Sequence, residues 1–384
     1  MLKKQQTELR DFGQRSGLKV YPVSIGAMRL PADEQEAIAL MRMAMDAGMV
    51  YIDTSRGYAD SEIKVGKSLK DGYRDKAILS TKWSPWNLKV QDDDDTSADC
   101  TYKRIIESME RLDVEYLDFY QIWSINNSEH YAQATKSGGM LDGIRRAVDE
   151  GLVGHIGFTT HDTPENISRY LDEADWCEAI LCTHNIMDQT YSPVLAKAHR
   201  KGIATIVMNP IAGGMLAEDS SLLSQAVRET LGGDDVVEAG HRYLHGNSDV
   251  DTILCGISKK SDVASTLANY RKPALTQEQR KAIEQAMAGL SSGQQGFCTG
   301  CGYCLPCPQG INIPAMMQVV YHDKILQVPR RAGALYRWAI NPASGEPSGP
   351  PADCARCGEC EKRCTRHLKI TEEMEYLARK YGKH

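Results

Sequence analysis

The sequence predicts an α/β protein: a (β/α)8 TIM barrel followed by a small, mainly helical domain that binds metal clusters. Two observations lead to this prediction. Eight apolar runs of strand length alternate with helical stretches over about 250 residues, and such alternation implies a parallel sheet. Eight of the twelve cysteines then fall in two short groups near the end of the chain. The expected domains are residues 1–290 and 291–384.

The barrel is predicted from the order of its elements. A short hairpin is expected at residues 10–21. The strands are then expected at Val23–Ala27, Val50–Asp53, Ala77–Ser80, Leu117–Ile122, His155–Phe158, Ala179–Cys182, Ala204–Met208 and Thr252–Cys255. Helices are expected at 34–47, 60–69, 97–112, 138–150, 164–173, 192–201, in pieces over 221–245, and at 261–270. A doubly wound sheet is the alternative, but no G-x-G-x-x-G follows the first strand.

The two cysteine groups have the spacing of iron–sulfur ligands. The first is Cys298, Cys301, Cys304 and Cys307, and the second is Cys354, Cys357, Cys360 and Cys364. Bacterial ferredoxins bind [4Fe–4S] clusters with such runs, and the fourth cysteine of a run ligates the other cluster. We therefore expect two [4Fe–4S] clusters, one on Cys298, Cys301, Cys304 and Cys364, the other on Cys354, Cys357, Cys360 and Cys307.

Zinc is the main alternative for these cysteines, but a tetrahedral zinc site rarely takes three ligands so close in sequence. Disulfides need an oxidising compartment, and the polar stretch Met1–Arg15 contains no apolar signal core. Around the clusters, helices are expected at Thr276–Leu290, Ile313–Val328, Ala332–Ile340 and Met374–Tyr381, with a loop at Asn341–Asp353.

Composition excludes several classes of function. With 42% hydrophobic and 25% charged residues, the chain can bury a sizeable core. A net charge of −6 argues against nucleic acid as the main partner, and no apolar run is long enough to cross a membrane. We expect a cytoplasmic protein whose partners are a small-molecule substrate and a redox protein of the ferredoxin or flavodoxin type. The acidic run Asp92–Asp95 is interpreted as a solvated loop tip.

Three polar residues stand just after two neighbouring strands of the predicted barrel. Asp53 ends one strand, Tyr58 follows it in the loop, and Lys82 ends the next strand. A lysine ammonium beside a phenol favours the phenolate and lowers the pKa of the tyrosine, and Asp53 can hold Lys82 in place. Tyr58 would then give and take protons near neutral pH. A structural Asp–Lys pair with an unrelated tyrosine stays open as the alternative.

Longer stretches support a resemblance to a known family. They include Ile52-Asp-Thr-Ser-Arg-Gly-Tyr-Ala-Asp-Ser-Glu, Leu79-Ser-Thr-Lys, Arg111-Leu-Asp-Val-Glu-Tyr-Leu-Asp-Phe-Tyr, Gly154-His-Ile-Gly-Phe-Thr-Thr-His and Asn209-Pro-Ile-Ala-Gly-Gly-Met-Leu. Over nearly its whole length the chain resembles the aldo-keto reductases, in the branch with a C-terminal ferredoxin-like domain. The resemblance implies a barrel in which an Asp, Tyr, Lys and His tetrad reduces carbonyls with NADPH. Asp53, Tyr58 and Lys82 match three of these four positions.

The fourth tetrad position departs from the family pattern, because Trp123 stands where the resemblance places the histidine. Tryptophan has one N–H donor, no acceptor and more bulk, so the substrate or the proton chemistry should differ. His130 and His161 are candidates to replace the missing imidazole. Trp83 and Arg29, together with Trp123, are expected to line the substrate pocket.

The nicotinamide positions match only in part. The resemblance assigns Ser258, Lys259 and Lys260 to the adenosine phosphate, although a helix N-cap with solvated lysines is an equal alternative. It places Thr159 and Asn185 near the carboxamide, and Gly213 and Gly214 near the pyrophosphate. Leu181 and Met208 occupy positions that usually carry an amide and an aromatic ring. NADPH is therefore a candidate cofactor, and a flavin stays open although no flavin motif is visible.

Three functions follow from these patterns. In the first, substrate and NADPH bind at the barrel mouth and the clusters exchange electrons with a partner. In the second, the barrel is an ordinary NADPH-dependent carbonyl reductase, and the clusters serve structure or docking. In the third, the chain is an electron carrier with a degenerate barrel, against which Asp53, Tyr58 and Lys82 argue. The first is the main prediction.

Overall fold

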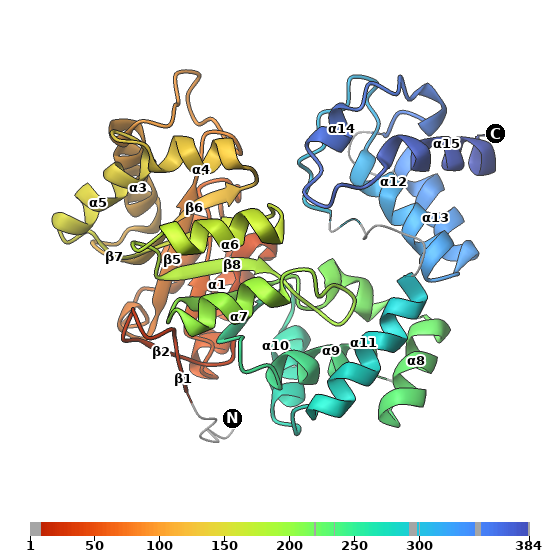
Figure 1. Cartoon of the computed structure of the whole chain (residues 1–384), viewed down its shortest axis with the longest axis horizontal. Coiled ribbons are helices and arrows are strands. Elements are labelled where there is room, and N and C mark those ends of the chain that lie inside the picture. The colour runs from red at the N-terminus through yellow and green to blue at the C-terminus, as the bar shows by residue number, and fades with distance from the viewer. Residues whose placement is uncertain are drawn as a thin grey trace. The chain divides into compact units, whose positions relative to one another are not determined.

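The computed structural model describes residues 9–218, 220–233, 235–291, 298, 300–341 and 347–382. Its first part is a closed barrel of parallel strands in the order β10-β3-β4-β5-β6-β7-β8-β9, with helices on the outside (Figure 1). The strands are β3 (Val23–Gly26), β4 (Tyr51–Asp53), β5 (Ile78–Trp83), β6 (Leu117–Ile125), β7 (Val153–Thr160), β8 (Ala179–Thr183), β9 (Ala204–Met208) and β10 (Thr252–Gly256). All eight predicted strands are present, so the predicted barrel is confirmed.

The helices outside the barrel lie close to their predicted positions. They are α1 (Glu34–Asp46), α2 (Ser61–Ser68), α3 (Ala98–Leu112), α5 (Met140–Asp149), α6 (Pro164–Glu173), α7 (Ser192–Arg200) and α10 (Lys260–Tyr270). Side-chain caps fix where several of them begin, because Asp33, Ser97 and Thr163 each accept a hydrogen bond from a backbone N–H of the first turn. Helix α4 (Ser128–Thr135) is absent from the prediction; Asn127 caps it in the same way.

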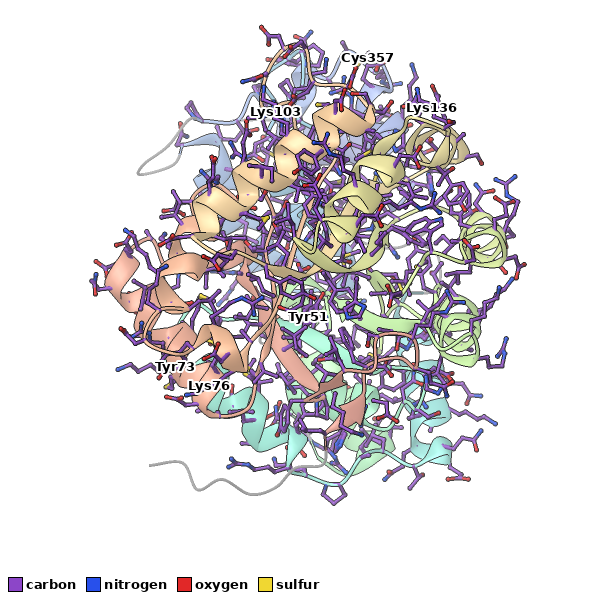
Figure 2. The ribbon with its side chains drawn as sticks, turned by 90° about the vertical axis from the view of Figure 1, so that its left-hand side faces the viewer. Tyr51, Tyr73, Lys76, Lys103, Lys136 and Cys357 are labelled. Carbon is purple, nitrogen blue, oxygen red and sulfur yellow. The ribbon has the colours of Figure 1, made fainter. Side chains whose placement is uncertain are left out.

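A hairpin closes the N-terminal end of the barrel. Strands β1 (Arg10–Asp11) and β2 (Lys19–Val20) pair antiparallel, as predicted. Between them, Phe12 packs edge-on against Tyr51 and Phe119, with ring centroids 5.0 and 5.4 Å away. Tyr51 is fully buried among the strands (Figure 2). Because this end is filled, the C-terminal ends of the strands are left for a functional site.

The acidic run Asp92–Asp95 is only partly the solvated tip that the sequence suggests. Asp94 is buried and forms an ion pair with the buried Arg104 at 2.7 Å. Its carboxylate also accepts hydrogen bonds from the backbone N–H groups of Val90 and Gln91. One acid of the four thus organises the loop that leads into α3, and the sequence alone does not show which one turns inward.

The second compact unit comprises Ile186–Asp188, Ile211–Gly240 and Thr276–His384. It therefore joins segments that follow β8 and β9 to the C-terminal part, whereas the domain boundary at 290/291 stays a prediction. Its helices are α8 (Ser221–Leu231), α11 (Gln277–Ser291), α12 (Ile313–Val320), α13 (Pro329–Ile340), α14 (Glu359–Lys362) and α15 (Ile370–Tyr381); α9 (Val236–His245) crosses between the units.

The helical character of the C-terminal domain is confirmed, with differences in where its helices begin and end. A π-helical turn at Tyr321–Ile325 interrupts the helix predicted over Ile313–Val328. Helix α13 begins at Pro329, earlier than predicted, because proline suits the first turn of a helix. Across the parts of the chain that the structure describes, no helix is both long and apolar enough to cross a membrane.

Candidate active site

A buried ion pair joins the ends of β4 and β5. The Lys82 ammonium donates to the Asp53 carboxylate and, at 2.8 Å, to the carbonyl oxygen of Thr54. Both side chains are almost fully buried. Burial raises the pKa of Asp53 and lowers the pKa of Lys82, and in each case the partner's charge opposes the shift. The predicted Asp–Lys pair therefore exists, and it holds Lys82 in one place.

Gln121 completes this arrangement and is missed by the sequence analysis. Its amide nitrogen, on β6, donates to the second Asp53 oxygen at 3.1 Å and to the Ser80 hydroxyl at 2.8 Å. The only signal in the sequence is a polar residue inside the apolar run Leu117–Ile122. Gln121 satisfies the carboxylate oxygen that Lys82 does not contact.

Tyr58 lies next to the ion pair, as predicted. The Lys82 nitrogen is 4.8 Å from the centre of the Tyr58 ring. The predicted pKa shift is wrong in direction, however: burial, and then the Asp53 charge, raise the pKa of Tyr58 well above its ordinary value. Burial disfavours the charged phenolate, and the Asp53 carboxylate repels it. Tyr58 is therefore a protonated phenol at neutral pH, suited to donating a proton rather than accepting one.

Trp123 forms one wall beside Tyr58. The two rings meet edge to face at an angle of 89°, with centroids 5.6 Å apart. A Cβ atom on Gly57 would lie 2.5 Å from the Trp123 ring, so the large ring fits here only because residue 57 is glycine. Trp123 thus occupies space beside the phenol, and Gly57 makes that space available.

Trp86, on the loop after β5, and His130, on helix α4, form a stacked pair. Their rings are 4.4 Å apart at an angle of 13°, and the Trp86 indole N–H donates to the carbonyl oxygens of Trp123 and Ser124. Burial lowers the pKa of His130, so its imidazole is neutral at pH 7. The stack holds the backbone of Trp123 in place.

Two of the predicted pocket residues have other surroundings. Trp83 is fully buried, and its indole N–H donates to the carbonyl oxygen of Leu88 at 2.8 Å, so it packs in the core and does not face a pocket. Arg29 is exposed at the end of a short 3-10 helix, Ala27–Arg29, directly after β3. A role of Arg29 in substrate binding stays a prediction.

The predicted adenosine phosphate site has the geometry of a helix cap. Asp262 accepts hydrogen bonds from the Ser258 hydroxyl and from the backbone N–H groups of Ser258 and Lys259, at 2.8 to 3.1 Å. Ser258, Lys259 and Lys260 are exposed. A phosphate would have to displace this carboxylate, so the donors present fit a 2′-phosphate poorly.

The remaining nicotinamide candidates are also engaged within the protein. The Thr159 hydroxyl accepts from the Ser124 N–H at 2.7 Å, and the Asn185 amide donates to the Asn209 carbonyl oxygen at 3.0 Å. Gly213 and Gly214 have positive φ angles of 71° and 107°, which only glycine adopts readily. Binding of NADPH by these residues stays a prediction.

The predicted ligands of the first cluster influence one another's pKa values. Burial is the main cause that raises the pKa of Cys298 to about 12, and the nearby Cys301 and Cys364 add to it. Burial also raises the pKa of Cys304 to about 12, with contributions from Cys298, Cys301 and Cys364. These effects indicate that the four residues are neighbours, and their assembly into one ligand set stays a prediction. A metal deprotonates the thiols that bind it, so this donor set fits a [4Fe–4S] cluster.

Among the predicted ligands of the second cluster, fewer such effects are found. Burial, then Glu361 and Cys354, raise the pKa of Cys360 to about 11, which places Cys354 near Cys360. Cys357 is exposed, and Cys307 packs against the same hydrophobic core as Cys354 and Cys360. Among the described residues, no three His, Cys, Asp or Glu side chains are close enough to hold a single metal ion. Both full ligand sets therefore stay predictions.

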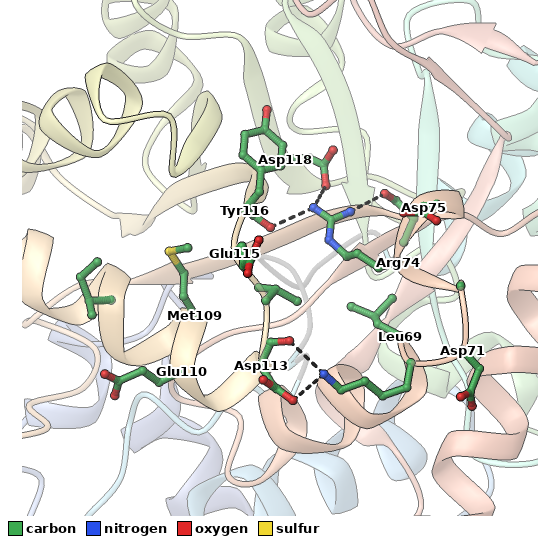
Figure 3. A pocket seen from close by; sticks show the side chains of 15 residues that line it. Leu69, Asp71, Arg74, Asp75, Met109, Glu110, Asp113, Glu115, Tyr116 and Asp118 are labelled. Carbon is green, nitrogen blue, oxygen red and sulfur yellow. Dashed lines mark hydrogen bonds and ion pairs between the residues drawn. The ribbon is translucent and has the colours of Figure 1, made fainter.

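A surface hollow elsewhere on the barrel unit does not belong to this site. It is lined by residues between the end of α2 and the start of β6, including Leu69, Arg74, Met109, Tyr116 and Asp118 (Figure 3). Arg74 pairs with Asp118 at 2.8 Å, and Lys70 pairs with Asp113. These residues precede β5 or lie before and at the start of β6, so the hollow lies at the N-terminal ends of the strands, away from Tyr58.

Comparisons with known proteins agree with this geometry. The model of the Aldo/keto reductase family matches residues 22–288, and that of the 4Fe-4S dicluster domain matches residues 297–369. The L-galactose dehydrogenase of Arabidopsis thaliana is 28% identical over 288 residues, which are 68% of this chain and 87% of the relative. The 6-dehydroglucose reductase of Novosphingobium aromaticivorans is 28% identical over 247 residues, or 58% of this chain and 75% of the relative.

Solved structures show the same fold. The aldo-keto reductase AKR11C1 from Bacillus halodurans, in its holo form, superposes with a TM-score of 0.62 at 23% identity. The match covers 73% of this chain and 96% of that chain. The structure named as the putative aldo-keto reductase PA4992 gives a TM-score of 0.55 at 22% identity, over 72% of this chain.

Proposed function

Because this chain belongs to the aldo/keto reductase family and carries a 4Fe-4S domain, we propose that it reduces the carbonyl group of a small hydroxylated molecule. The electrons would be exchanged through two [4Fe–4S] clusters. The observation that carries the proposal is the buried Lys82–Asp53 pair beside Tyr58, in a chain whose residues 297–369 match a 4Fe-4S dicluster domain. The substrate class rests on relatives that are named for sugar chemistry.

The residues of the barrel would handle the protons of this reaction. Reduction of a carbonyl to an alcohol takes two electrons and two protons. Tyr58, a neutral phenol, can donate one proton to the carbonyl oxygen, and the other comes from solvent. Lys82, fixed by Asp53, places a positive charge beside the phenolate that results. When bound, the clusters would supply electrons singly, whereas a nicotinamide would supply a hydride.

A second candidate is an NADPH-dependent carbonyl reductase whose clusters serve structure or docking. Membership in the family supports it. The carboxylate of Asp262 at the predicted phosphate site counts against it, because it occupies the donors that the phosphate would need. In both proposals Trp123 stands where the family has a histidine. This replacement would remove a hydrogen-bond donor to the carbonyl group of the substrate and would narrow the pocket.

One experiment separates these functions. Anaerobic holoprotein, reduced with one equivalent of dithionite per cluster, would be mixed with D-glyceraldehyde as a small hydroxylated aldehyde. We expect the cluster absorbance to return as the alcohol forms. Tyr58→Phe should slow this by about 10²- to 10⁴-fold, the usual contribution of a general acid, with an unchanged cluster spectrum. Tyr73→Phe is the matched control, because its hydroxyl bonds Asp46 elsewhere on the barrel.

The outcomes are distinct. Equal rates in Tyr58→Phe and wild type would overturn the role of Tyr58. No reoxidation in the wild type, combined with alcohol formation from NADPH at constant cluster absorbance, would replace the proposal with the second candidate.

A further inference from the structure

Helix α13 forms one side of the cluster domain. Its inner residues Ala332 and Ala339 are buried in the hydrophobic core that also contains Cys304 and Cys360, and Leu335 and Tyr336 pack against that core. Four more of the predicted ligands, Cys298, Cys307, Cys354 and Cys364, pack against the same core. The outer face of α13 is therefore separated by one helix, ~10 Å across, from the hydrophobic core that contains or contacts these cysteines.

The outer face of α13 is strongly basic. Arg330, Arg331 and Arg337 are exposed, and the helix contains no acidic residue. The sequence has no Asp or Glu between Asp323 and Glu346. In the described parts of the chain, none of the three arginines forms an ion pair, whereas nearby Lys324 and Lys380 are paired with Glu373 and Asp323. Three unneutralised charges thus stand together on a chain whose net charge is −6.

An exposed aromatic side chain stands among these arginines. Trp338 is 60% exposed, the highest value among the exposed large hydrophobic residues of the described chain. Residues 330, 334, 337 and 338 recur at helical spacing, so Arg330, Arg337 and Trp338 share one face. Tryptophan and arginine dominate the binding energy of many protein interfaces. We call Arg330, Arg331, Arg337 and Trp338 the α13 patch.

We propose that the α13 patch is the docking surface for an acidic one-electron carrier protein of the ferredoxin or flavodoxin type. Charge complementarity identifies this occupant, because three unpaired arginines attract an acidic surface and a second copy of this acidic chain would be repelled. Such a carrier would bind on the outside of a helix whose inner side faces the core that contains or contacts the cysteines. Each encounter would move one electron: the reduced carrier is oxidised, and the cluster domain gains one negative charge. This inference rests on the proposed function.

The test compares two variants of the same net charge. In the first, Arg330→Gln, Arg331→Gln and Arg337→Gln remove the charges of the patch. In the control, Lys136→Gln, Arg200→Gln and Arg271→Gln remove three exposed charges from the barrel unit. Oxidised holoprotein would be mixed anaerobically with a reduced plant-type [2Fe–2S] ferredoxin, and the rate of electron transfer followed by stopped-flow absorbance at several salt concentrations.

We expect a fast, salt-sensitive second-order rate in the wild type and in the control. In the patch variant the rate should fall by about 10- to 100-fold at low salt and lose most of its salt dependence, because steering by charge is lost. Trp338→Ala should lower the rate while keeping the salt dependence. Equal electron-transfer rates in the patch variant and the control would overturn the proposal. The proposal would also be overturned if the patch variant lost binding to anionic vesicles or nucleic acid but kept the wild-type rate of electron transfer.

The result is separable from the proposed function. If dithionite-reduced wild type reduces D-glyceraldehyde but the patch variant exchanges electrons with ferredoxin normally, only the docking surface is wrong. If ferredoxin reduces the wild type at a rate that depends on the patch, but no aldehyde is reduced, the surface holds and the proposed function is wrong.

Discussion

Gly57 and Trp123 depend on each other at the site. A Cβ atom added at Gly57 would be 2.5 Å from the Trp123 Cζ3 atom, closer than to any other group outside its chain neighbours. The Trp123 ring in turn packs edge-on against Tyr58. A substitution at residue 57 should therefore affect the Tyr58 phenol by moving the Trp123 ring, although residue 57 has no functional group of its own.

Gly57→Ala should displace the Trp123 ring and impair the reaction at Tyr58. We expect turnover of the reduced holoprotein with D-glyceraldehyde to fall about tenfold in the wild-type background, which corresponds to ~1.4 kcal/mol. In a Trp123→His background the same change should lower turnover by less than about twofold, because the smaller imidazole ring leaves room for the added carbon. The difference between the two backgrounds would measure the coupling between residues 57 and 123. Gly233→Ala, which has no atom within 4 Å of the added carbon, is the control. Equal losses in both backgrounds would show that the two residues do not act together.

For individual residues, the sequence predicts where a side chain lies better than it predicts the pKa or the contacts of that side chain. Asp53, Tyr58 and Lys82 could be placed together because the ends of neighbouring parallel strands meet at one edge. The direction of the Tyr58 pKa shift could not be predicted, since it depends on how deeply the fold buries the phenol and on the Asp53 charge beside it. Gln121 and Gly57 act through residues far away in the sequence, so their roles appear only in the fold.

The loop after β5 and helix α4 are tied together by one stacked pair, Trp86 and His130. The His130 ring accepts a hydrogen bond at Nδ1 from the backbone N–H of Asn126, at 3.4 Å, which requires a neutral nitrogen there. Glu129 and Asp162 favour the charged ring, but burial outweighs them and lowers the pKa of His130. Protonation of His130 should therefore loosen the stack and with it the backbone of Trp123.

The pH dependence follows from this shift. The folded protein binds the His130 proton less tightly than the unfolded chain, so stability falls as pH drops from the ordinary value of about 6.5 towards the lower folded value. In His130→Phe, which keeps an aromatic ring on Trp86, the melting temperature of the barrel should change less between pH 7.5 and pH 5 than in the wild type. His199→Phe, at an exposed histidine, controls for removal of a titrating group. Parallel curves for His130→Phe and wild type would contradict the argument.

The elements of the fold follow from local patterns, and the exceptions have local causes. The strands and most helices can be predicted from the sequence because apolar runs and caps recur with regular spacing. Helix α4 is short and polar, with only two buried residues, so periodicity does not reveal it. The π-helical turn after α12 places Tyr321, His322 and Asp323 in buried positions, and a sequence pattern read at 3.6 residues per turn does not predict such a break.

At the scale of the whole molecule, the second compact unit includes segments that follow β8 and β9 of the barrel. Within this unit Asp188 pairs with Arg366 at 2.6 Å, and both side chains are mostly buried. Glu218 lies 3.4 Å from His322, and Tyr321 donates to the sulfur of Met187. Arg366 follows the predicted ligand Cys364 by two residues, so the cluster-binding segment is linked to the segment after β8. Such long-range pairs leave no local pattern in the sequence, and the domain boundary at 290/291 stays a prediction.

The Asp188–Arg366 pair should hold residues 186–188 against the cluster domain. Asp188→Ala removes the carboxylate and leaves a buried guanidinium, a change that typically costs about 3–5 kcal/mol, whereas replacing both residues by leucine should cost much less. In holoprotein we expect hydrogen exchange of the amides at 186–188 and 366–368 to rise at least tenfold in Asp188→Ala, and less in the double variant. Lys369→Gln, which removes an exposed pair with Glu372 on the same segment, should change exchange by under about twofold. If the amides of Asp188→Ala exchange no faster than those of Lys369→Gln, the ion pair does not fix residues 186–188. Other contacts within the second compact unit must then hold this segment.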